Sequence, residues 1–77
     1  MTFEQIEMQI EELLVSLGGE LSPQECDEVR HFLSVGEYGL ALQTLGDIIK
    51  EENKRITDIC RAKILMLAKV MDMENPI

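Results

Sequence analysis

The sequence has no tryptophan, only three other aromatic residues, two cysteines and no apolar stretch of membrane length. So few aromatic side chains on a chain of net charge −8 cannot form a base-stacking platform, which argues against a nucleic-acid partner. The apolar run 64–68 lies between Lys63 and Lys69 and is too short to cross a bilayer. The first residues lack the basic and apolar regions of a secretory signal, so we expect a cytoplasmic protein that does not bind membranes. Cys26 and Cys60 follow no motif spacing and are expected to be reduced thiols.

Basic residues are also scarce in the first 49 residues. Residues 1–49 hold ten acidic residues and one basic residue, whereas residues 50–77 hold five acidic and six basic residues. An acidic half repels nucleic acid and attracts basic proteins over long distances. The alternative is that the acidity only keeps the protein in solution. The length of 77 residues predicts a single domain over 1–77 with a thin core.

Apolar residues recur at helical spacing, and no segment alternates strictly between apolar and polar residues. Capping-box patterns, Thr2 with Gln5 and Ser22 with Glu25, predict the starts of two helices, which end near residues 18 and 36. A third helix is predicted over about 37–52, and a fourth runs from a Thr57 cap to about residue 73. The sequence therefore predicts an all-α fold, a compact bundle of four helices.

The same spacing predicts which side chains point inward. The expected core positions of the four helices are Phe3, Ile6, Ile10, Leu13, Leu14 and Leu17; Cys26, Val29, Phe32 and Leu33; Tyr38, Ala41, Leu42, Leu45, Ile48 and Ile49; and Cys60, Ile64, Leu67 and Met71. The fourth helix has a second apolar face, made of Ile59, Met66, Val70 and Met73. Either this helix is central in the bundle, with the methionines filling the core, or its second face meets another chain.

Catalytic residue types are almost absent, so we expect no enzyme activity. The one histidine, His31, lies one turn after Asp27, and we expect the two to form an exposed ion pair. This pair alone is too small a ligand set for a structural metal site, and we expect no metal or cofactor. The carboxylates of the first helix have no apolar pocket nearby to shift their pKa values, so we expect them to be solvated.

One string stands out: Gly36-Glu37-Tyr38-Gly39-Leu40-Ala41-Leu42, followed by Leu45. Gly36 is expected to end one helix and Glu37 to open the next, and Gly39 then lies within the first turn of that helix, where a glycine is unfavourable. Together with the preceding segments 21–25 and 29–33 and the later Ile56-Thr57, this string resembles the Maf-type immunity proteins and their relatives from contact-dependent growth inhibition systems. The resemblance covers roughly residues 20–60. It implies a cytoplasmic protein that binds and neutralises a cognate bacterial toxin domain. Gln43 and Gly46 stand where the family often has glutamate and cysteine, which suggests a surface adapted to another partner.

On this hypothesis the toxin domain is a nuclease, and an acidic surface covers its basic active site. The acids expected to attract the partner are Glu4, Glu7, Glu11 and Glu12 of the first helix and Asp27 and Glu28 of the second. The expected desolvated anchors are Met8, Tyr38 and Leu40, and Gln43 and Asp47 complete the expected contact set. A second candidate contact is the strip opened by Gly39 and Gly46, against which either the first or second helix or a partner could pack. The alternative function is a non-catalytic adaptor or self-association module, with a homodimer formed through the fourth helix.

Overall fold

The computed structural model describes residues 1–77 and contains four helices and no strand. The helices are α1 (Phe3–Ser16), α2 (Pro23–Ser34), α3 (Tyr38–Glu51) and α4 (Asp58–Val70). The prediction of an all-α bundle of four helices is confirmed. None of the four is long and apolar enough to cross a membrane.

Three of the four helix starts follow predicted caps, whereas Glu37, which precedes α3, makes no side-chain cap hydrogen bond. The Thr2 side chain accepts a hydrogen bond from the Gln5 backbone, and the Gln5 side chain accepts one from the Thr2 backbone; Ser22 and Glu25 repeat this arrangement. Thr57 caps α4 by accepting a bond of 3.1 Å from the Cys60 backbone. These local bonds satisfy amide groups that have no partner inside the helix, which is why short polar side chains set the helix starts.

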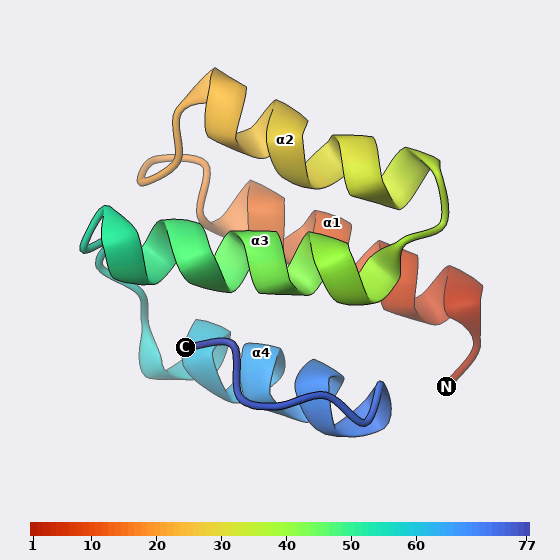
Figure 1. Cartoon of the computed structure of the whole chain (residues 1–77). Coiled ribbons are helices and arrows are strands. Elements are labelled where there is room, and N and C mark those ends of the chain that lie inside the picture. The colour runs from red at the N-terminus through yellow and green to blue at the C-terminus, as the bar shows by residue number, and fades with distance from the viewer.

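The helix ends are less regular. Gly36 closes α2 in a left-handed conformation with φ of 74°, and the Glu37 amide then donates to the Phe32 carbonyl at 2.9 Å. α4 ends three residues before the predicted end, because Asp72 adopts φ of 52° and the Met73 amide donates back to the Ala68 carbonyl. The chain after α4 therefore turns back along the bundle (Figure 1).

α3 is the central helix of the bundle. In Figure 1 it lies between α2 and α4, with α1 behind it, and sequential helices run in opposite directions. α3 contacts each of the other three helices. Its inward face supplies the centre of the core, where Ala41, Leu42 and Leu45 are wholly buried together with Ile10 of α1, Val29 of α2 and Ile64 and Leu67 of α4.

Most of the predicted core residues are buried, with a few corrections. Phe3 is wrong, because it is 73% exposed at the end of the bundle, where its ring stacks on Tyr38 with centroids 5.8 Å apart. Tyr38 is only half-buried, as are Cys26, Phe32 and Met71, which pack against the edge of the core. Phe3 therefore lies at an open apolar depression at the end of the bundle rather than inside the core.

The second apolar face of α4 is not part of the core. Ile59, Met66 and Val70 are exposed, whereas Met73, beyond the end of the helix, is half-buried against the core. α4 therefore lies at the edge of the bundle, and the suggestion that it is the central helix is wrong. The central position belongs to α3.

The glycine strip of α3 is divided by the chain's own C-terminal segment. Gly46 is buried beneath Pro76, which is itself wholly buried, whereas nothing lies over Gly39. The expectation that α1 or α2 packs on this strip is wrong at both glycines. Absence of a side chain at Gly46 lets the backbone of Pro76 approach the helix closely.

Replacing Gly46 with alanine should therefore push this segment away. A Cβ atom there would lie 2.6 Å from the Cβ of Pro76, closer than atoms can pack. Overpacking costs roughly 1–3 kcal/mol, against which alanine gains about 1 kcal/mol of helix propensity. We expect Gly46→Ala to destabilise the full chain in chemical denaturation, yet to stabilise a chain truncated after Glu74. Equal effects in both backgrounds would contradict the proposed clash.

Candidate functional site

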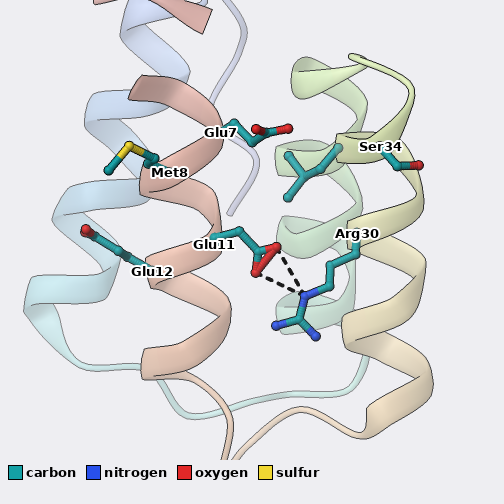
Figure 2. A pocket seen from close by; sticks show the side chains of 7 residues that line it. Glu7, Met8, Glu11, Glu12, Arg30 and Ser34 are labelled. Atoms are coloured by element: carbon teal, nitrogen blue, oxygen red, sulfur yellow. Dashed lines mark hydrogen bonds and ion pairs between the residues drawn. The ribbon is translucent and has the colours of Figure 1, made fainter. Parts of the chain in front are cut away.

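Seven of the eleven predicted contact residues line three separate surfaces, and Glu4, Asp27, Leu40 and Gln43 line none of them. The first is a groove between α1 and α2, shown in Figure 2, lined by Glu7, Met8, Glu11, Glu12, Arg30, Leu33 and Ser34. Glu7 and Glu11 point toward α2, whereas Met8 and Glu12 project from the other side of α1 (Figure 2). Four predicted residues thus meet along one helix but do not present a single charged face.

Two of the four carboxylates of α1 are neutralised within the molecule. Both Glu11 oxygens accept hydrogen bonds from Arg30 Nε, at 3.0 and 3.2 Å, and this bond raises the pKa of Arg30. Lys63 of α4 donates to Glu12 at 3.1 Å. Glu11 and Glu12 remain accessible to solvent, as expected, but they are not free to attract a partner, because each one joins α1 to a neighbouring helix.

The second surface, which we call the α2/α3 groove, is more acidic. Its seven lining residues are Glu25, Glu28, Thr44, Asp47, Ile48, Glu51 and Glu52. Glu28 and Asp47 belong to the predicted contact set, whereas Glu25, Glu51 and Glu52 were missed. The sequence contained part of the information, because the helical spacing of Thr44, Asp47 and Glu51 places them on one side of α3. Only the antiparallel packing of α2 on α3 brings Glu25 and Glu28 beside them.

Part of this acidity is balanced by lysines. Lys54 contacts Glu25 at 3.0 Å, and Lys50 lies 3.8 Å from Asp47, which also accepts a hydrogen bond of 2.9 Å from Gln43. Glu28, Glu51 and Glu52 are exposed and take part in no ion pair. The α2/α3 groove therefore carries three uncompensated negative charges, and it replaces α1 as the main acidic face.

Leu40 lies on the same side of α3 as the acids of this groove. Asp47 and Glu51 follow Leu40 by seven and eleven residues, which places the three on one helical stripe. Leu40 is 50% exposed although it is a large apolar residue. Leu40 does not line the groove itself, and Glu51 lies about 16 Å further along the helix. A protein contact that extends along this stripe would combine an apolar anchor with a polar surround.

Tyr38 belongs to the third surface, away from that groove. It lines an apolar depression at the open end of the bundle together with Phe3, Gly39, Val70 and Met71, among others. Gly39 adds no side chain there, and nothing covers it. Tyr38 and Leu40, although two residues apart, therefore face different surfaces.

The predicted ion pair between Asp27 and His31 is not formed. Both residues are exposed, and neither takes part in any of the ion pairs of the structure. The His31 ring instead meets the edge of the Phe32 ring, with centroids 5.4 Å apart. No three histidine, cysteine, aspartate or glutamate side chains lie close enough together to hold a metal ion.

The pKa of Glu25 is lowered, first by the hydrogen bond from the Ser22 backbone and then by the bond from Lys54. A carboxyl with a depressed folded-state pKa stabilises the fold above its ordinary pKa, and this contribution is lost as the pH falls through the lowered value. We expect the urea midpoint to fall with acidification in that range. Glu25→Gln, which keeps the capping geometry but not the charge, should flatten this part of the profile. An unchanged profile would assign the acid sensitivity to other carboxyls.

Comparison with known proteins leaves this geometry to be interpreted on its own. No protein-family model matches the chain, and neither a curated protein nor a solved structure is significantly similar to it.

Proposed function

We propose that this protein is a non-catalytic immunity protein of the cytoplasm, which binds a cognate bacterial toxin domain and neutralises it. The proposal draws on two independent supports. One is the Gly36–Leu42 string and its flanking segments, which resemble those of Maf-type immunity proteins. The other is the α2/α3 groove, whose composition suits a basic protein partner.

The observation that carries the proposal is the set of unpaired carboxylates at the α2/α3 groove. Toxins of this class are often nucleases, whose active sites are basic because they bind phosphates. Glu28, Glu51 and Glu52 would attract such a surface at long range and align it during encounter. Once docked, an acidic helical domain excludes the nucleic-acid substrate by occupying its place.

Affinity requires more than attraction, because exposed ion pairs contribute little energy each. Leu40 supplies an apolar anchor on the same stripe, and Ile48 forms an apolar part of the groove wall. Truncating an anchor of this kind mainly speeds dissociation, whereas removing a rim charge mainly slows association. The proposed interface therefore assigns different kinetic roles to Leu40 and to the carboxylates.

The test is calorimetric binding to the toxin domain encoded immediately upstream, at low and at moderate salt, with protection of the toxin's target as a second readout. We expect nanomolar binding that weakens with salt, because salt screens the attraction between the carboxylates and the basic toxin surface. Tight binding that is indifferent to salt would keep the function but move the interface to an apolar surface. Absence of binding would overturn the proposal and favour the adaptor module.

A further inference from the structure

α1 and α4 together form an exposed apolar surface that the proposed toxin contact does not use. We call it the α1/α4 face; its apolar members are Met8 and Val15 of α1 and Ile59, Met66 and Val70 of α4, all exposed. The Glu12–Lys63 ion pair joins the two helices across it. Exposed apolar side chains gathered on neighbouring helices typically mark a contact with another protein.

The relative positions of these side chains follow from the ion pair. α1 and α4 run in opposite directions (Figure 1), and Glu12 of α1 lies beside Lys63 of α4. Because both helices rise equally per residue, Met8 lies within about one residue of the level of Met66, and Val15 within about one residue of the level of Ile59. The α1/α4 face is thus two apolar rows with one neutralised charge pair between them.

The charges on the two helices differ in sign. Of the four glutamates of α1, Glu7 and Glu11 point toward α2 and Glu12 is paired with Lys63, so Glu4 is the unpaired charge of α1 on this side. On α4, Arg61 and Lys69 are unpaired, against the single acid Asp58. A partner that covers both helices must therefore be basic where it meets α1 and acidic where it meets α4. A second copy of this chain has that pattern on this same surface.

We propose that the α1/α4 face binds a second copy of this chain about a twofold axis parallel to the two helices. This axis places α1 of each copy over α4 of the other, so unlike charges meet twice. An axis across the helices would set α1 against α1 and α4 against α4, where like charges repel. The parallel axis also places Glu4 of one copy near Lys69, at the C-terminal end of α4 of the other copy. Both residues are exposed and have no ion pair within the chain.

The size of the molecule limits the strength of this dimer. Its largest outline measures 28 × 24 Å. A contact over one whole face of this outline would cover on the order of 700 Å² per copy, close to the roughly 800 Å² of a standard stable interface, so a contact limited to the α1/α4 face fits a weak dimer. We expect a reversible dimer with a dissociation constant above about 10 μM, rather than a permanent one. The α2/α3 groove is formed by the other two helices and stays open in this arrangement.

The experiment is sedimentation equilibrium of the full chain from 10 μM to 1 mM. We expect the unaltered chain to pass from monomer to dimer over this range. Ile59→Glu should weaken dimerisation at least about tenfold, because it buries an unpaired charge in the contact. Ile59 is 80% exposed and lies in the first turn of α4, where a glutamate is favourable, so the variant should fold. Val35→Glu, at an exposed site on the α2–α3 turn, is the control and should dimerise normally.

A charge-exchange experiment tests the orientation. Glu4→Lys alone and Lys69→Glu alone should each dimerise at least about tenfold more weakly, because each homodimer then contains two like-charge contacts. An equimolar mixture of the two variants should form a heterodimer of near-original affinity, which a loss of folding could not produce. A chain that stays monomeric at 1 mM overturns the proposal, as does a mixture that fails to restore dimerisation. If Ile59→Glu instead abolishes toxin binding, the toxin occupies this face, which also overturns the proposal while leaving the immunity function intact.

Discussion

Reversing the charge at Glu28 and Glu51 together should slow association with the toxin domain by about 100-fold at low salt, and by much less at high salt. Electrostatic steering changes association rates by roughly 10- to 1000-fold, and screening removes most of this gain. The two residues face the α2/α3 groove from different helices and have no ion pair to lose. The double change Glu28→Lys with Glu51→Lys therefore alters the field of the groove without removing an internal bond. Stopped-flow association at two salt concentrations measures the effect.

The matched control is Glu20→Lys with Glu74→Lys, which changes the net charge equally. Glu20 is exposed between α1 and α2 and Glu74 in the C-terminal segment, and neither forms an ion pair. We expect this control to slow association several-fold less than the groove variant. Equal slowing by both would mean that only the net charge matters, and it would remove the argument for the α2/α3 groove.

Glu11 and Glu12 are poorer positions for such a test. Charge reversal there would break the bond of Glu11 to Arg30 and the bond of Glu12 to Lys63, so each change also loosens the packing of α1 on a neighbour. A loss of toxin binding could then reflect a weaker fold. The tertiary structure thus moves the decisive substitutions from α1 to α2 and α3.

Leu42→Ala should destabilise the fold by about 3–4 kcal/mol, as truncation of a wholly buried leucine leaves a cavity that its surroundings fill only partly. Leu42 is fully buried on the central helix. A chain of 77 residues typically has a total stability of about 4–12 kcal/mol, so this loss is a large share of it. Urea denaturation followed by circular dichroism measures the change.

Leu40→Ala is the matched control, since it removes the same atoms from the same helix two residues away. Leu40 is half-exposed, and we expect a loss of stability below about 1 kcal/mol. If Leu40 anchors the toxin, this variant should instead raise the dissociation rate at least tenfold. A large stability loss at Leu40 would show that its side chain is part of the core and would remove it from the proposed interface.

The fold was largely predictable because its signals are local. A helix start needs only a capping residue and the amide three positions later, as at Thr2, Ser22 and Thr57. The inward face needs only the spacing of apolar residues, which correctly places Ile10, Leu42 and most other core side chains. The errors lie at the edges, where exposure depends on how far a neighbouring helix extends: Phe3 lies at an open depression at the end of the bundle, and the outer face of α4 has no neighbour.

The sequence by itself determined the four helices, the side-chain caps of three of them and their core faces, because each depends on neighbours within a few residues. It also determined the excess of negative charge in residues 1–49. Only the tertiary structure decided which carboxylates are free. Glu11 meets Arg30 across 19 positions and Glu12 meets Lys63 across 51, while Glu28 and Glu51 remain unpaired. It also decided that Gly46 is covered by Pro76 and that Gly39 is open. These contacts depend on the register between packed helices, and the periodicity of one helix carries no information about the register of another.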